Sequence, residues 1–213
     1  MDRLLEGYSR FRRDAWPHQR ELYEQLADGQ TPRLLVIACS DSRADPSQIF
    51  DVAPGELFVV RNVAALVPPC EQGEGLHGTS AAIEFGVQAL GVQTILVMGH
   101  ARCGGVKAAI ERGRWGSKAS QDSQNMRFVN QWIDILVPCV VALGTDEIEP
   151  CERACVELSL ANLMSFPFVA QKVKDGILTL EGARFDIATG GLDLYNAQRG
   201  WVRADASSAK PVA

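Results

Sequence analysis

The sequence predicts a single-domain α/β protein with a central, mainly parallel β-sheet flanked by helices. Short apolar runs at 34–38, 57–62 and 92–98 alternate with segments of helical periodicity. This alternation is typical of parallel strands buried on both faces. The length of 213 residues suits one domain with a substantial core, and no internal repeat or second domain is evident.

The first segment, residues 1–30, is expected to form an N-terminal helical arm. Its apolar residues follow amphipathic spacing between Leu4 and Leu26, with an interruption at Pro17. Such an arm needs a surface against which to bury its apolar face, either the chain's own sheet or a partner subunit. Residues 31–203 then form the α/β domain, and 204–213 a frayed, flexible tail.

The remaining elements alternate along the chain and end in a C-terminal hairpin. A loop rich in Gly, Pro and Glu precedes the second helical region, and a polar, Ser-rich loop follows the third strand and its helix. In chain order we expect a strand at 34–38, a strand at 57–62, a loop at 68–78, a helix at 79–90, a strand at 92–98, a helix opening at 104–111, a loop at 114–124, helices over 125–143 and 148–164, and a hairpin pairing 177–182 with 184–190.

Three potential metal ligands follow two of the apolar runs. Cys39 follows the first run, and His100 and Cys103 follow the third. Because ligands of open parallel sheets bind beyond the carboxyl ends of the strands, we expect these side chains to converge there. Two thiolates and one imidazole suit zinc, and three protein ligands leave a position for water. This pattern indicates a catalytic zinc site, although a His-x-x-Cys pair could also be two unrelated core residues.

Four ordered motifs make the chain resemble the β-class carbonic anhydrases. The resemblance extends from about Leu22 to Tyr195, and its motifs are 38–43, 54–64, 81–85, and 99–100 with 103–105. It implies one Zn²⁺ per subunit on Cys39, His100 and Cys103, and reversible hydration of CO2 to bicarbonate and a proton. Zinc lowers the pKa of bound water from about 15.7 towards 7, which provides a hydroxide that can attack CO2. Because two thiolates cancel the charge of the ion, we expect activity to rise into mildly alkaline pH.

Asp41 and Arg43 strengthen this interpretation. An extended turn after Cys39 can point both towards the metal, with Arg43 holding the ionised carboxylate by charge-assisted hydrogen bonds. The resemblance implies that Asp41 accepts the proton of zinc hydroxide and orients the attack, and that in some members the same Asp closes the site by binding zinc. The alternative is a helix cap with a surface ion pair.

Val36 and Gln30 favour the plant-type subclass, in which the site stays open. Members regulated by the Asp resemble one another in a Trp three residues before the first Cys, where this chain has Val36. Gln30 stands where plant-type members place a Gln that binds substrate or bicarbonate across the subunit interface. Phe58 and Val63 correspond to residues lining the CO2 pocket, and ordinary strand core is the alternative.

Two further substrate-site positions are Phe85 and Gly104. Phe85 stands where a Tyr is usual, so one hydrogen bond near the pocket is in doubt. Gly104 and Gly105 begin a helix, where exposed backbone N–H groups could hold a bicarbonate oxygen. Close packing is the competing explanation for both glycines.

Other histidines and cysteines have simpler interpretations. His18 is expected on a solvated helix face, whereas His77 could act as a proton shuttle, although nothing in the sequence fixes its distance from zinc. Cys139, Cys151 and Cys155 could hold a second metal, but buried thiols are the simpler expectation.

Composition and charge limit the partners. A formal charge of −5 argues against a nucleic-acid or anionic-membrane role, and no stretch is long enough to span a bilayer. The start does not look like a signal or transit peptide, and six cysteines without a secretory signal fit a reducing cytoplasm. The resemblance implies that the arm wraps around another copy, so we expect a homodimer or higher homo-oligomer.

Two alternatives to CO2 hydration remain open at this stage. A variant of the same fold would hydrolyse CS2 or COS through a narrowed tunnel, but no extension obviously supplies one. A non-catalytic zinc- or bicarbonate-binding module would be marked by the loss of Arg43 or by a Trp at position 36, and neither is seen.

Overall fold

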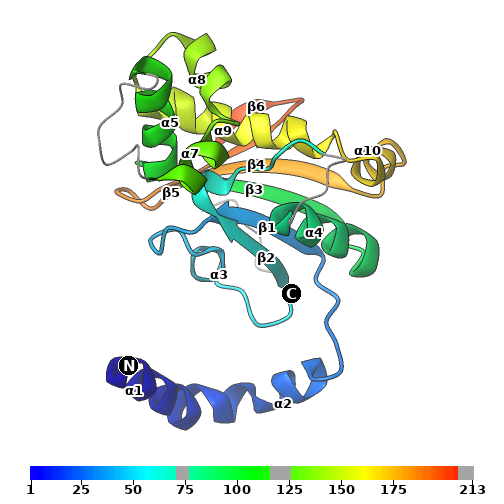
Figure 1. Cartoon of the computed structure of the whole chain (residues 1–213). Coiled ribbons are helices and arrows are strands. Elements are labelled where there is room, and N and C mark those ends of the chain that lie inside the picture. Colours follow the sequence, from blue (N-terminus) through cyan, green and yellow to red (C-terminus); the bar gives the residue numbers. More distant parts are fainter. Residues whose placement is uncertain (71–76, 116–125, 206–213) are drawn as a thin grey trace.

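The computed structural model describes residues 1–70, 77–115 and 126–205. Figure 1 shows a central sheet covered by helices, with an N-terminal pair of helices set apart from this body. The strands are β1 (Leu34–Cys39), β2 (Leu57–Asn62), β3 (Thr94–His100), β4 (Thr179–Asp186), β5 (Gly191–Asn196) and β6 (Gly200–Arg203). Their order in the sheet is β2-β1-β3-β4-β5-β6. The first four are parallel, and β5 and β6 add antiparallel strands.

The helices connect these strands in the order expected of an α/β fold. They are α1 (Asp2–Arg10), α2 (Trp16–Leu26), α3 (Pro46–Ile49), α4 (Gly78–Glu84), α5 (Gly104–Trp115), α7 (Arg127–Ile133), α8 (Val137–Leu143), α9 (Ile148–Leu163) and α10 (Pro167–Lys174). The fold class predicted from the sequence is therefore confirmed, together with the three parallel strands that carry the motifs. Helix α10 was not anticipated, because the predicted helix ended at residue 164 and no element was assigned between it and the C-terminal hairpin.

Two predicted helices each contain a π-helical turn, in which the backbone hydrogen bonds span five residues instead of four. Helix α4 continues as a π-helical turn at Phe85–Ala89, and a similar turn at Phe11–Ala15 joins α1 to α2. Pro17 itself interrupts nothing, because it lies in the first turn of α2, where a missing N–H costs no hydrogen bond. The segment predicted as one helical region at 125–143 forms α7 and α8.

The C-terminal hairpin exists, but its predicted strands were wrong. Residues 179–186 form one strand, β4, which pairs with β5. The prediction ended one strand at Gly182 and began the next at Arg184. Instead, a Cβ at Gly182 would lie 2.7 Å from Val156 Cγ1, so this glycine lets α9 pack closely on the sheet. The absence of a side chain at Gly182 thus reflects close packing rather than a turn.

The two faces of the parallel sheet are covered unequally. On one face, Leu35, Ile37 and their neighbours pack with residues of α4, α9 and α10 in the largest buried cluster. On the other face, Val36 and Ala38 belong to a smaller cluster, where Ile49 and Phe50 at α3 provide part of the cover. This thin cover leaves the second face dependent on few contacts within the chain.

The N-terminal arm stands away from the body (Figure 1). No residue of α1, of the π-helical turn or of α2 is buried. Leu4, Leu5 and Tyr8 are exposed, and Leu26 at the end of α2 would contact a Cβ placed at Gly55. The alternative in which the arm packs on the chain's own sheet is therefore not what the structure shows.

Parts of three predicted segments, at 71–76, 116–125 and 206–213, lie outside the described residues. They belong to the two loops predicted at 68–78 and 114–124 and to the C-terminal tail. Among the described residues, no helix is both long and apolar enough to cross a membrane.

Candidate metal centre

Cys39, His100 and Cys103 converge at the carboxyl edge of the sheet. Cys39 is the last residue of β1 and His100 the last residue of β3, its neighbour. Their ligand atoms and that of Cys103 lie within 4.8 Å of one another, and all three residues are buried. The sequence prediction that these residues meet at one sheet edge is confirmed.

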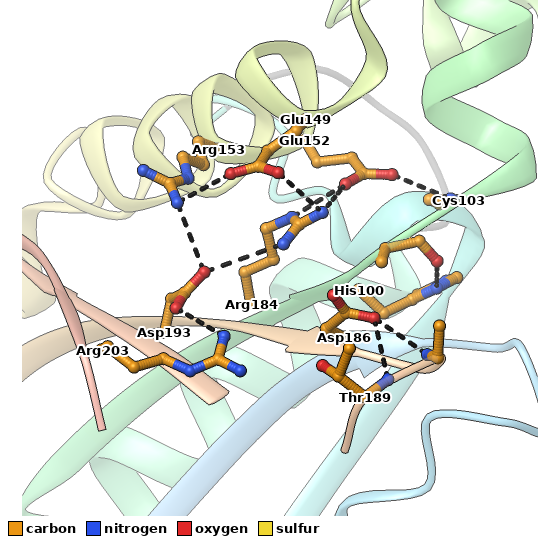
Figure 2. Close-up of polar contacts among 12 residues, drawn as sticks. His100, Cys103, Glu149, Glu152, Arg153, Arg184, Asp186, Thr189, Asp193 and Arg203 are labelled. Carbon is orange, nitrogen blue, oxygen red and sulfur yellow. Dashed lines mark hydrogen bonds and ion pairs between the residues drawn. The ribbon is translucent and has the colours of Figure 1, made fainter. Parts of the chain in front are cut away.

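The geometry of this cluster fits a zinc ion. The two sulfurs are 4.0 Å apart, close to the separation of about 3.8 Å that a tetrahedral site with Zn–S bonds of about 2.3 Å requires. His100 Nδ1 lies 2.9 Å from the Ala101 carbonyl oxygen, which identifies it as the protonated nitrogen (Figure 2). His100 Nε2 is buried and has no hydrogen-bond partner among the described residues. The unprotonated Nε2, buried beside two thiol groups, is therefore in the position and form to coordinate a metal ion.

The two thiols of the cluster differ in acidity. The hydrogen bond from Cys103 lowers the pKa of Cys39 to about 4, and the same bond raises the pKa of Cys103. Burial alone would lower the pKa of His100, but the neighbouring Cys39 thiolate outweighs it and raises that pKa. The site therefore already favours a thiolate, the form that binds metal.

Asp41 is held beside the cluster by Arg43. The backbone N–H and Nε of Arg43 donate to Asp41 Oδ1 at 2.9 and 3.0 Å, and Nη2 donates to Oδ2 at 2.7 Å. These hydrogen bonds hold the pKa of Asp41 well below its usual range. Asp41 Oδ2 also lies 3.8 Å from His100 Nε2. The carboxylate thus faces the ligands while both of its oxygens bond to Arg43.

Arg61, which sequence analysis did not single out, fixes the loop that carries Cys39 and Asp41. Its Nε donates to the Cys39 carbonyl oxygen at 2.9 Å and its Nη2 to that of Asp41 at 2.6 Å. Its Nη1 donates to Asp45 Oδ2 at 2.8 Å. The signal in the sequence was a single cation in the apolar strand at 57–62, where a charge needs a buried partner.

Glu152, also missed, contacts the second ligand loop. Its side chain lies on α9 and accepts a hydrogen bond from the Cys103 backbone N–H at 3.2 Å (Figure 2). It also pairs with Arg184 of β4. No pattern in the sequence marks either residue as part of the site. A Glu on an amphipathic helix, in particular, is usually expected to face solvent.

Val63 and the two glycines lie next to the ligands. Gly105 is required for close packing, because its Cβ would lie 2.8 Å from Val63 Cγ1 and 2.9 Å from Ala64 Cβ. A Cβ at Gly104 would meet nothing within 4 Å. The backbone at Gly104 therefore faces open space, which an anion would need in order to approach it. Gly105, by contrast, allows close packing.

The other substrate-site candidates lie away from the cluster of their own chain. Phe58 pairs with Leu35 at the start of β2, four positions from the pair Cys39 and Asn62, or about 13 Å along the strand. The Phe85 ring lies 5.8 Å from that of Phe58 and is 53% exposed. Gln30 is an exposed residue between α2 and β1. Phe58 is therefore far from the metal cluster of its own chain, and Phe85 and Gln30 are exposed.

His77 lines a cavity of about 680 Å³ together with Val63 and Trp132. Its Nε2 is buried and has no hydrogen-bond partner among the described residues. Trp132 Nε1 donates to the Val63 carbonyl oxygen at 2.8 Å, so one wall of this cavity is tied to the loop beside the ligands. His18 is exposed.

In the described part of the chain the remaining cysteines do not form a second metal site, and Cys39, His100 and Cys103 are the only such cluster of potential ligands there. All six cysteines are free. Cys155 donates to the Ala64 carbonyl oxygen at 3.3 Å, and burial raises its pKa. These thiols therefore behave as packing groups.

Comparison with known proteins gives a consistent result. The sequence profile of the carbonic anhydrase family matches residues 34–192. The chain is 36% identical over 205 residues to β carbonic anhydrase 3 of Arabidopsis thaliana, covering 92% of this chain and 76% of that protein.

Solved structures agree with this match. The structure of the β-carbonic anhydrase CcaA superimposes with a TM-score of 0.85 at 30% identity, covering 97% of this chain and 92% of the other. A tetrameric β-carbonic anhydrase of Sordaria macrospora has a TM-score of 0.76 at 28% identity, covering 91% and 95% respectively.

Proposed function

The chain belongs to the β-carbonic anhydrase family, and from that premise we propose that it catalyses the reversible hydration of CO2 to bicarbonate at Cys39, His100 and Cys103. Carbonic anhydrases are lyases, and the β-class enzymes use zinc. The observation that carries the proposal is the convergence of two thiols on a buried, unpartnered imidazole nitrogen. That donor set fits zinc and leaves a position for substrate chemistry.

The protein's own contribution to the reaction centres on Asp41. Zinc, when bound, supplies a Lewis acid that brings the pKa of a water molecule close to neutrality. Oδ2 of Asp41 faces the ligands and can accept the proton of the oxygen nucleophile, which orients its lone pair towards CO2. Arg43 fixes this carboxylate through three hydrogen bonds and keeps it ionised.

We propose that this site is of the open, plant-type kind. Both oxygens of Asp41 bond to Arg43, and this arrangement opposes rotation of the carboxylate onto the metal. Val36, where closed members carry a Trp, is fully buried in the small cluster on the α3 face. These two observations support a resting state that is ready for substrate.

We further propose a homo-oligomer in which one chain completes the pocket of another. The arm exposes Leu4, Leu5 and Tyr8 with no cover from its own chain. Phe58 and Phe85 lie at the far end of β2 from their own cluster, where they can line only a neighbour's pocket. In a dimer, the arm would bury its apolar face and bring Gln30 to the partner.

The test is stopped-flow CO2 hydration between pH 6.5 and 9 on protein of measured zinc content. We expect zinc-dependent turnover that is present near pH 7 and rises with pH. Asp41→Asn is the matched variant, because it keeps the size of the side chain but removes the charge that pairs with Arg43. We expect it to lower turnover by about 10²–10⁴-fold, the usual contribution of a positioned acid or base.

Two results would contradict the proposal. Zinc-loaded protein without turnover at any pH would indicate a binding module rather than an enzyme. Turnover that appears only steeply above pH 8 would mean that Asp41 closes the site, which would contradict the open-site assignment. Sedimentation of wild-type protein and of Leu5→Asp tests the oligomer, and a monomeric wild type would exclude a shared pocket.

A further inference from the structure

A cluster of charged side chains, buried at its centre and exposed at its rim, lies behind Cys103, between α9 and the three C-terminal strands (Figure 2). It contains three carboxylates and three guanidinium groups, so its formal charges balance. Its members are Glu149, Glu152 and Arg153 of α9, Arg184 of β4, Asp193 of β5 and Arg203 of β6. The proposed chemistry at Asp41 uses none of these side chains.

Glu152 and Arg184 form the innermost pair of this cluster. Their side chains are 1% and 6% exposed. Arg184 Nε donates to Glu152 Oε2 at 2.8 Å, and its Nη2 lies 2.8 Å from the same oxygen in an ion pair. The other carboxylate oxygen, Oε1, accepts the backbone N–H of the zinc ligand Cys103. One buried carboxylate therefore links a buried cation to the main chain of a metal ligand.

Stability alone is a weak explanation for this pair. Removing two charges from water is costly, and apolar side chains of similar volume often stabilise a core as well or better. Positions as deeply buried as these two would ordinarily hold such side chains. What an apolar residue cannot do is accept the Cys103 N–H, which would then be buried without a partner.

The backbone at Cys103 needs such an anchor. Arg102, the preceding residue, has a positive φ of 58°, which an L-residue other than Gly adopts only with strain. The same turn separates His100 from Cys103 and so sets the distance between two ligands. On its other side, the Ala101 N–H donates to the Phe185 carbonyl oxygen at 2.8 Å. The turn is thus fixed at both ends by neighbours from β4 and α9.

The register of the sheet places Arg184 where it can serve this turn. Arg184 lies opposite Gly99 on β3, and Phe185 lies opposite His100. Asp193 Oδ2 lies 3.7 Å from Arg184 Nη1, beyond hydrogen-bond distance, so Glu152 is the closer partner of this guanidinium group. Strand β4 therefore carries both the carbonyl that holds Ala101 and the cation that holds Glu152.

We propose that Glu152 and Arg184 are positioning residues for the metal centre. Glu152 fixes the Cys103 backbone at the separation from Cys39 and His100 that zinc requires, and Arg184 holds the Glu152 carboxylate in that orientation. The inference rests on the proposed function only in sharing its metal site, because it concerns metal binding rather than turnover. Partners of this kind typically change metal affinity by about 10–100-fold when removed.

Two double variants separate the hydrogen bond from the charge. Both replace the buried ion pair by neutral side chains, so neither leaves an unpaired buried charge. Glu152→Gln with Arg184→Met keeps a carbonyl oxygen for the Cys103 N–H. Glu152→Met with Arg184→Met removes it. Asp193→Asn is the control, because it alters the same cluster without contacting Cys103.

The readouts are the zinc dissociation constant, from competition with a chromophoric chelator, and the thiolate-to-metal charge-transfer band of the Co²⁺-substituted protein. We expect the Met/Met variant to bind zinc about 10–100-fold more weakly than the Gln/Met variant, with an altered charge-transfer band. Asp193→Asn should keep the zinc affinity of the wild type even if its unfolding midpoint falls.

Several outcomes would overturn the proposal. Equal zinc affinity and equal cobalt spectra in the two double variants would make the cluster purely structural, as would an equal loss of affinity in Asp193→Asn. If the Met/Met variant does not fold, Arg184→Lys provides the comparison, because Lys keeps the charge but cannot donate through a rigid fork. Unchanged zinc affinity and cobalt spectrum in Arg184→Lys would likewise refute it. Zinc-loaded wild type without CO2 hydration would contradict the proposed function but leave this inference intact.

Discussion

The two loops that carry the metal ligands are both fixed by an arginine from a neighbouring strand, but in opposite chemical ways. After β1, Arg61 donates directly to the carbonyl oxygens of Cys39 and Asp41. After β3, Arg184 reaches Cys103 only through Glu152. A guanidinium group carries donors and no acceptor. It can therefore bond directly to a backbone carbonyl oxygen. To fix a backbone N–H group, it needs a carboxylate between itself and that N–H.

The two arrangements also differ in burial. The side chains of Arg61 and Asp45 are 26% and 33% exposed, because β2 is an edge strand. Those of Arg184 and Glu152 are 6% and 1% exposed, because β4 lies inside the sheet under α9. Water can replace a lost partner at the first loop but not at the second. The same loss should therefore cost more at Arg184 than at Arg61.

The largest expected effect is that of Arg184→Met alone. It leaves the Glu152 carboxylate buried without a countercharge, and breaking a buried pair in this way typically costs about 3–5 kcal/mol. We expect that loss in the free energy of unfolding of the zinc-free protein, measured in urea. The double variant with Glu152→Gln should recover most of it. A loss below about 1 kcal/mol would mean that water reaches Glu152.

Arg61→Met should have a smaller effect on stability. It removes hydrogen bonds to two carbonyl oxygens and to Asp45, in a region that solvent partly reaches, and we expect a loss of about 1–3 kcal/mol. The same urea experiment, run beside Arg184→Met, compares the two loops directly. Equal losses at the two arginines would contradict the argument from burial.

Gly104 and Gly105 provide a comparison inside the second loop. Gly105→Ala forces a Cβ against Val63 and Ala64. Overpacking typically costs about 1–3 kcal/mol and the loss of glycine flexibility returns about 0.4–1 kcal/mol, so we expect a net loss of about 1 kcal/mol. Gly104→Ala should instead raise the free energy of unfolding by about 0.4–1 kcal/mol, because its Cβ meets open space and only the gain from reduced chain flexibility remains. If the two variants lose equal stability, the distinction between a packing glycine and an exposed one is wrong.

Sequence patterns predicted the parts of the centre that depend on local order along the chain. Cys39 and His100 end apolar runs, so their meeting at one sheet edge follows from the fold class alone. Glu152 and Arg184 escaped prediction because the contacts that define them join residues 49 and 32 positions apart. Gly182 was misread for the same reason, since its neighbour Val156 comes from α9. Close approach between distant segments leaves no periodic signal.

A third loop leaves the same edge of the sheet, after β4, and carries no metal ligand. Among the residues that the structure describes, no arginine donates a hydrogen bond to this loop. Instead, Asp186 Oδ1 accepts the N–H groups of Ala188 and Thr189 at 2.9 and 3.3 Å (Figure 2). The loop closes on its own side chain, as ordinary turns do. The contrast associates the arginine anchors with the ligands they position rather than with the sheet edge itself.

Asp186→Asn tests this contrast with the smallest expected effect. The hydrogen bond from the Ala188 N–H, followed by that of Thr189, lowers the pKa of Asp186 in the folded protein. A carboxyl group with a lowered folded pKa stabilises the protein above its unfolded pKa of about 3.9, and this contribution disappears as the pH falls through the folded value. The difference in stability between wild type and Asp186→Asn should therefore be present at pH 7 and shrink below about pH 4. Zinc affinity should stay unchanged, because this turn holds no ligand. A loss of zinc affinity in Asp186→Asn would mean that all three loops at this edge are coupled to the metal centre.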